Sequence, residues 1–236
     1  MLIANKSRAT LGMILGVSFF GILALIFAPI YGGMDGLKYS DRLFNRLAKG
    51  SSYFVPELSH MIESFNQKEL SVRIDMEKAE DAARAQKIFS KAAPDTTAQG
   101  AVLNVKGNLA KLLGAVLEDC NSMYLNKADE VVGRYGVDGK EVLLAWHRGL
   151  NSMAKELQKS KDIPESKLIL AVVTKGIEPA YNFYGVQPES INHRAGIVTF
   201  LLVFYLVYTL WYGFAIYFLF DGFGMAMTKA RVKREV

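Results

Sequence analysis

Two stretches of this chain contain no charged residue, and they lie near its two ends. The first runs from Thr10 to Ile30 and the second from Ala195 to Phe220. A helix needs about 20 apolar residues to cross a hydrocarbon core of about 30 Å, and both stretches are long enough. We therefore predict transmembrane helices over residues 10–31 and 195–220, with most of the charge held between them.

Between these stretches, hydrophobic residues recur mainly at helical spacing. The clearest pattern, in residues 140–159, is a heptad of apolar residues: Leu143, Trp146, Leu150, Met153 and Leu157. A second pattern predicts a long helix that begins at Val102 and presents Val105, Leu109, Leu113, Val116, Cys120 and Met123 on one face. Shorter helices are expected at 40–49, 55–65, 76–92 and 165–184, the last kinked at Pro179, while residues 71–75 alternate and could be extended.

These patterns predict an all-α membrane protein in which two transmembrane helices flank an extracytoplasmic helical bundle domain. Residues 32–194 form the bundle domain in this prediction. Residues 1–9 form a short N-terminal tail, and residues 221–236 form a basic C-terminal tail. The central region contains neither an internal repeat nor a low-complexity segment, so we expect a single domain there.

The formal net charge of +5 is concentrated in the tails. They carry six basic residues against two acidic ones, whereas the rest of the chain carries 22 basic and 21 acidic residues. Basic residues beside a membrane helix favour the cytoplasmic side. We expect a protein of the bacterial inner (cytoplasmic) membrane, with both termini cytoplasmic and the central domain periplasmic or extracellular, although basic residues at 38, 42, 46 and 49 weaken that bias. The C-terminal tail is expected to contact anionic lipid headgroups, and no basic face indicates nucleic-acid binding.

The first apolar stretch is expected to act as an uncleaved signal anchor. Lys6 and Arg8 precede it, as in a signal peptide, but it is longer than the roughly 7–15 residues of a signal-peptide core. The exit through Phe27 and Ala28 contains no clean pattern of small residues for cleavage. The N-terminal helix is therefore expected to remain in the protein.

Each predicted membrane helix carries a candidate packing surface. Gly12 and Gly16 have the spacing that lets two membrane helices approach closely, which also permits a homo-oligomer. Tyr205, Tyr208 and Tyr212 share one helical face near the middle of the second stretch. Phenol groups in hydrocarbon need hydrogen-bond partners, so we expect this face to pack on another protein helix; the alternative is that each phenol bonds its own backbone.

Candidate chemical groups are sparse. Glu57, His60 and Glu63 have half of the spacing of a di-iron carboxylate site, but neither His147 nor His193 supplies the other half. Cys120 lies on an apolar stripe and is expected to be a buried structural residue. We therefore expect no catalytic, metal-binding or cofactor-binding residues, and no enzymatic activity.

An aromatic cluster ends the last helix predicted in the central domain. Tyr181, Phe183 and Tyr184 could line a ligand pocket, cap the core or rest on the membrane surface. These residues are therefore candidates for ligand or membrane-surface contact.

Two functions fit these patterns. The first is a non-catalytic, membrane-anchored interaction protein, an accessory, scaffold or assembly subunit of an inner-membrane complex that contacts other membrane protein subunits through its transmembrane helices. The alternative is an extracytoplasmic ligand-binding sensor domain that signals through a partner protein. The second function rests on architecture alone, which is a weak guide to activity.

Overall fold

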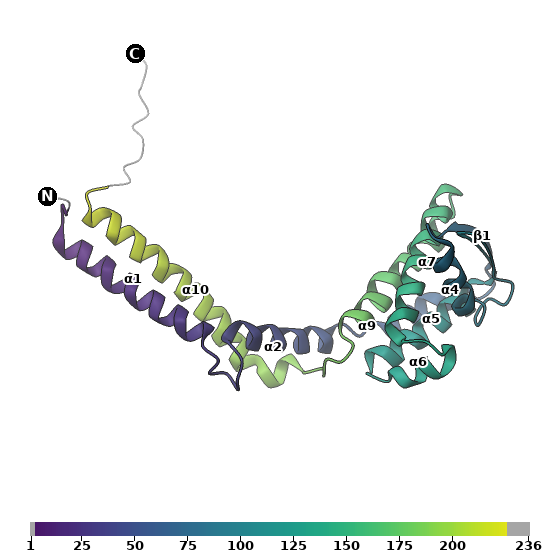
Figure 1. Ribbon diagram of the computed structural model, residues 1–236, viewed down its shortest axis with the longest axis horizontal. Helices are drawn as coiled ribbons and strands as arrows, with labels where there is room; N and C mark the ends of the chain where they lie inside the picture. Colours follow the sequence, from purple (N-terminus) through teal and green to yellow (C-terminus); the bar gives the residue numbers. More distant parts are fainter. Residues whose placement is uncertain (1–2, 226–236) are drawn as a thin grey trace, which may run out of the picture. The chain divides into compact units, whose positions relative to one another are not determined.

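The computed structural model describes residues 3–225, and the chain is mostly helical (Figure 1). Contacts divide it into two compact units, one of residues 1–44 and 190–236 and the other of residues 45–189. We describe each unit by itself. The four basic residues of the C-terminal tail on which its predicted lipid contacts depend, Lys229, Arg231, Lys233 and Arg234, lie outside the described residues.

The first unit contains the two long apolar helices, α1 (Lys6–Phe27) and α10 (Ile191–Gly222), which run antiparallel and side by side. Both are long and apolar enough to cross a membrane. Their cores match the predicted stretches 10–31 and 195–220, although α10 begins four residues earlier. Only Gly12 in α1 and two small residues in α10, Ala215 and Gly222, are buried. These helices are therefore not the core helices of a globular domain.

Helix α2 (Gly36–Ser51) follows α1 after a turn through Gly32 and Gly33, both of which have the positive φ that glycine tolerates best. The helix is longer at both ends than the predicted segment 40–49. Its apolar side chains lie on one side, while Lys38, Arg42 and Arg46 lie on the other. This is the pattern of an amphipathic helix.

The core of the second unit forms around α7 (Gly139–Lys159) and α5 (Leu109–Tyr124). All five residues of the predicted heptad in α7 are buried, so this prediction is confirmed. The Trp146 ring packs against Phe89 of α4 (Ala79–Phe89) with ring centroids 4.4 Å apart. The remaining helices pack around this centre: α3 (Val55–Glu63), α6 (Ala128–Tyr135), α8 (Ile163–Val172) and α9 (Glu178–Asn182).

The second unit also contains a three-stranded antiparallel sheet, so it is not all-α. The strands are β1 (Glu69–Asp75), β2 (Thr97–Gln99) and β3 (Val102–Asn108), in the order β1-β3-β2. The predicted extended segment 71–75 lies within β1. The prediction of a helix that begins at Val102 is wrong, because Val102–Asn108 pairs with Asp75–Glu69 and the helix begins at Leu109.

A short π-helix, Val173–Ile177, separates α8 from α9, where a single kinked helix was predicted. Pro179 lies in the first turn of α9. Because proline has no N–H and crowds the preceding turn, a wider turn just before it relieves the clash. The break in helical geometry therefore lies immediately before the proline that was expected to cause it.

Candidate functional site

The first candidate site is the interface between α1 and α10. A Cβ atom at Gly12 would lie 2.6 Å from the backbone nitrogen of Leu219, and one at Gly222 would lie 2.5 Å from the backbone of Ala9. Only glycine allows such close approach of two helix backbones. At Gly16, by contrast, an added Cβ would meet nothing within 4 Å. The structure therefore brings one member of the predicted glycine pair into this interface and leaves the other outside.

Aromatic residues continue this interface toward the middle of the helices. The Tyr208 ring stacks on Phe19 with centroids 4.4 Å apart, and its hydroxyl donates to the Phe19 carbonyl oxygen at 3.1 Å. The Trp211 indole N–H donates to the carbonyl oxygen of Leu15 at 3.2 Å. The helix that meets Tyr208 thus belongs to the same chain.

The other two predicted tyrosines of α10 lie differently. Tyr212 contacts Phe19 through its ring, at 5.1 Å between centroids, yet remains 48% exposed. Tyr205 is 72% exposed. Among the described residues, neither phenol hydroxyl has a hydrogen-bond partner, so this part of α10 presents two unsatisfied polar groups on an apolar surface.

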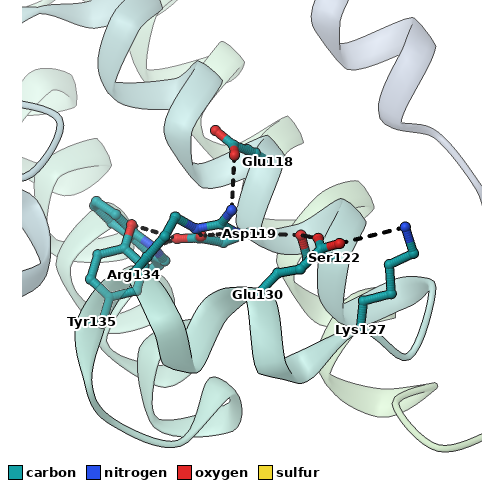
Figure 2. A network of polar contacts seen from close by, with 8 residues as sticks. Glu118, Asp119, Ser122, Lys127, Glu130, Arg134 and Tyr135 are labelled. Carbon is teal, nitrogen blue, oxygen red and sulfur yellow. Dashed lines mark hydrogen bonds and ion pairs between the residues drawn. The ribbon is translucent and has the colours of Figure 1, made fainter.

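The second candidate site is a buried polar network in the second unit (Figure 2). The carboxylate of Asp119 in α5 is completely buried. Its oxygens accept hydrogen bonds from the Trp146 indole and the Tyr135 hydroxyl, each at 2.8 Å, and from the Arg134 Nε at 3.0 Å. Burial raises the pKa of Asp119, whereas these three donors lower it; burial has the larger effect.

The network extends from Arg134 toward the surface. The guanidinium also donates to Glu118 at 2.8 Å and to the Ser122 hydroxyl at 3.3 Å, which in turn donates to Glu130 at 2.7 Å. Figure 2 shows these side chains converging from α5 and α6. Because the donors to Asp119 come from α6 and α7, the network links both helices to α5.

Lys49 occupies a second buried polar position and is only 1% exposed. Its ammonium donates to the Asn126 side-chain oxygen at 3.1 Å and to the backbone oxygens of Phe183 and Val186 at 3.0 and 2.7 Å. Tyr124 adds its ring, 5.1 Å from the Lys49 nitrogen, and donates its hydroxyl to the Lys49 carbonyl. None of the three acceptors is a carboxylate, and burial lowers the pKa of Lys49.

Two cavities meet at His147 in α7. One has a volume of about 240 Å³ and is lined mainly by apolar residues, including Leu143 and Ile177; the other has a volume of about 400 Å³ and is lined mainly by charged residues, including Asp81 and Arg148. The His147 Nε2 lies 3.7 Å from a Glu178 carboxylate oxygen. This arrangement could receive a small amphipathic ligand. Local sequence patterns did not predict it, because its walls come from segments far apart in the chain.

The three aromatic residues that were predicted to form a cluster, Tyr181, Phe183 and Tyr184, have different surroundings. Tyr181 lines the smaller cavity, and Lys140 lies over its ring at 5.2 Å and over that of Tyr184 at 5.7 Å. Phe183 packs against the core and supplies its carbonyl oxygen to Lys49. The three residues therefore do not form one surface.

Two of the residues that were considered as candidates for metal binding or catalysis, Glu57 and Cys120, have structural surroundings. Glu57 pairs with Lys175 at 2.8 Å, and Cys120 is buried, which raises the pKa of its thiol far above the usual range. Among residues 3–225, no group of three or more His, Cys, Asp or Glu side chains is arranged to hold a metal ion. The described part of the chain thus offers packing surfaces and cavities rather than a cluster of reactive groups.

No protein-family model, curated protein or solved structure matches this chain.

Proposed function

We propose that this chain is a non-catalytic, membrane-anchored interaction protein, an accessory or assembly subunit whose helices α1 and α10 cross the inner membrane. The observation that carries the proposal is the surface of α10 at Tyr205 and Tyr212. Both phenols are largely exposed and lack a hydrogen-bond partner among the described residues. In hydrocarbon, a phenol without a partner is costly, so a second protein helix that offers an acceptor stabilises this surface.

The packing within the chain supports the same proposal. Gly12 and Tyr208 lie in the contact between α1 and α10. This antiparallel pair of helices, called the hairpin below, therefore packs together without a contribution from Tyr205. What remains exposed is available to a partner. We place both termini in the cytoplasm and residues 45–189 outside it, following the basic residues of the tails.

The test is purification of the tagged full chain from its native host in a mild detergent, at its normal expression level. We expect at least one membrane protein to copurify in a fixed ratio and to be lost from the double variant Tyr205→Leu/Tyr212→Leu. The matched control is Leu206→Ala/Leu210→Ala, at two exposed positions on another side of α10, which should retain the partner. Recovery of a lone monomer or homodimer from wild-type membranes contradicts the proposal.

The second candidate function, a ligand-binding sensor domain, is favoured by the cavities beside His147. Pockets of roughly 300–1,000 Å³ hold most small ligands; the larger cavity, of about 400 Å³, falls in this range, and the smaller one, of about 240 Å³, lies just below it. The test is a thermal-shift screen of the full chain with small amphipathic metabolites. A stabilising compound whose effect disappears in Tyr181→Ala supports a sensor; the absence of any such compound argues against it.

A further inference from the structure

A separate apolar groove lies in the first unit, between α1, the beginning of α2 and the first half of α10. Its volume is about 860 Å³, within the range of small-molecule sites. The side chains around it are almost all aliphatic or aromatic, and they include Leu23, Phe27, Leu37, Phe44, Phe200 and Tyr205. Such a lining suits a hydrocarbon chain.

The extent of the groove matches one leaflet of a bilayer. Along α10 its lining runs from Ile197 to Tyr208, which is about 16 Å at 1.5 Å per residue. This is close to half of a hydrocarbon core of about 30 Å. Beyond Tyr208 the space closes, because Trp211 bonds to α1 and Gly12 contacts Leu219. A partner helix would cross both leaflets, so the shorter groove fits an acyl chain better.

The floor of the groove is rigid. Tyr208 lines it while stacked on Phe19 and bonded to the Phe19 carbonyl oxygen. Phe204 stacks in turn on Tyr208, with ring centroids 5.4 Å apart. A preformed apolar surface of this kind binds a flexible chain without first having to reorganise.

Basic residues lie on α2 on the side of the helix away from the groove. Leu37 and Phe44, which line the groove, are 56% and 44% exposed. Lys38 and Arg42 lie on the opposite, polar side of the same helix. An amphipathic helix with this distribution is typical of membrane surfaces, where its apolar side faces the hydrocarbon and its basic side faces the headgroups.

From these observations we infer that the groove binds one glycerophospholipid, with an acyl chain between α1, α2 and α10 and the headgroup at the membrane surface beside α2. The inference rests on the proposed membrane position of α1 and α10, but it does not require a protein partner. The bound lipid would fill the cleft at the α1–α2 corner and cover Tyr205, which lines the groove, and it would leave Tyr212 free for a neighbouring helix. This site is distinct from the headgroup contacts expected of the C-terminal tail.

The first test is native mass spectrometry of the purified full chain in a mild detergent, with a phosphorus assay on the same sample. We expect about one retained phospholipid per chain. Leu202→Trp, which fills the groove, should reduce retention about tenfold. Val207→Phe, at a position of α10 that does not line the groove, serves as the matched control and should leave retention unchanged.

The second test needs no variant. The wild-type chain is placed in phosphatidylcholine vesicles that contain phosphatidylglycerol with a photoreactive diazirine on its acyl chain. After illumination, we expect labelled peptides concentrated in residues 23–44 and 197–208. Labelling spread evenly along α10, or a purified chain without phospholipid, overturns the inference.

The outcomes separate this inference from the proposed function. If the purified chain retains lipid but copurifies with no membrane protein, the proposed function is wrong and the lipid site is supported. Conversely, if Leu202→Trp abolishes copurification of a partner and the wild-type chain carries no phospholipid, a protein helix occupies the groove and the lipid site is wrong.

Discussion

The two units of this chain treat polar and apolar groups in opposite ways. In residues 45–189 the apolar side chains close on themselves, and the buried polar groups Asp119 and Lys49 are surrounded by partners. In the hairpin of α1 and α10, nearly all apolar side chains face outward, and the phenols of Tyr205 and Tyr212 are unsatisfied. The second unit therefore buries its apolar side chains and satisfies these polar groups by itself. The pair of α1 and α10 needs an apolar environment or a partner to do the same.

This difference is the basis for the proposed sites of interaction. A large exposed apolar surface marks contact with a membrane or a protein, whereas saturated polar networks mark rigidity. By this reasoning, the pair of α1 and α10 is the part of the molecule that contacts a membrane or a protein. The buried polar networks of the second unit hold its helices together. The predictions below test the two halves of this comparison, from the largest expected effect to the smallest.

Removal of the Asp119 carboxylate should be the most damaging single change. Asp119→Leu leaves the Tyr135 hydroxyl and the Trp146 indole without their acceptor, and Arg134 keeps only Glu118 and Ser122. We expect a loss of about 3–5 kcal/mol in the free energy of unfolding, because one ion pair to a buried carboxylate and two hydrogen bonds to it are lost together. Urea unfolding followed by Trp146 fluorescence, in a Trp211→Phe background, measures it.

The control for this change is Glu118→Ala. Glu118 bonds the same Arg134 guanidinium, but its side chain is largely exposed, so its loss should cost no more than about 1 kcal/mol. Equal effects of the two substitutions would show that the network does not hold the second unit together.

Lys49→Met should destabilise the second unit by about 1–3 kcal/mol, because two backbone carbonyls and the Asn126 amide oxygen lose their donor in a buried place. The same unfolding measurement applies, with Lys38→Met as the control because Lys38 is well exposed. Local hydrogen exchange should also rise in residues 183–189. A stability equal to that of Lys38→Met would contradict the role given to Lys49.

Gly12→Leu should weaken the hairpin by about 1–3 kcal/mol, since the added atoms have no room between the helix backbones. Gly16→Leu, where an added Cβ meets nothing within 4 Å, should have little effect. Heating the detergent-solubilised chains and following the loss of the monodisperse peak in size-exclusion chromatography compares them. A larger loss for Gly16→Leu would place the interface of α1 on the wrong face.

The smallest effect concerns pH. Burial lowers the pKa of Lys49 in the folded chain, while its pKa in the unfolded chain stays at about 10.4. Between these two values the unfolded chain holds more protons, so the free energy of unfolding rises with pH. The stability difference between wild type and Lys49→Met should therefore grow as the pH rises toward about 10. A constant or shrinking difference in urea titrations would show that Lys49 is not desolvated.

Local patterns predicted much of the helical structure. The heptad of α7 was found because its five apolar residues repeat at a fixed spacing. Strand β3 was missed because Val102, Val105 and Leu109 also fit a helical spacing, while the buried pair Leu103 and Val105 follows the two-residue period of a strand. Pairing with β1, whose residues lie 27–39 positions before their partners in β3, decides between them, and local spacing does not record it.

The polar networks were also missed, and one signal could have revealed Asp119. It lies three residues after Val116 and four before Met123, so it falls on the apolar stripe of its own helix. A carboxylate at such a position must find buried partners. For Lys49 and the cavities at His147 no comparable signal exists, since their partners come from segments far apart in the sequence.

The central claim is that α1 and α10 cross a membrane and carry residues 45–189 on the opposite side from the termini. Single cysteines at two exposed positions, Ser7→Cys and Gln158→Cys, test it most directly in a Cys120→Ala background. The chain is expressed in bacteria and treated with a membrane-impermeant maleimide. We predict that Gln158→Cys is labelled in intact spheroplasts and that Ser7→Cys is labelled only after the membrane is permeabilised. Equal labelling of both positions before permeabilisation, or recovery of the chain in the soluble fraction, would contradict the account.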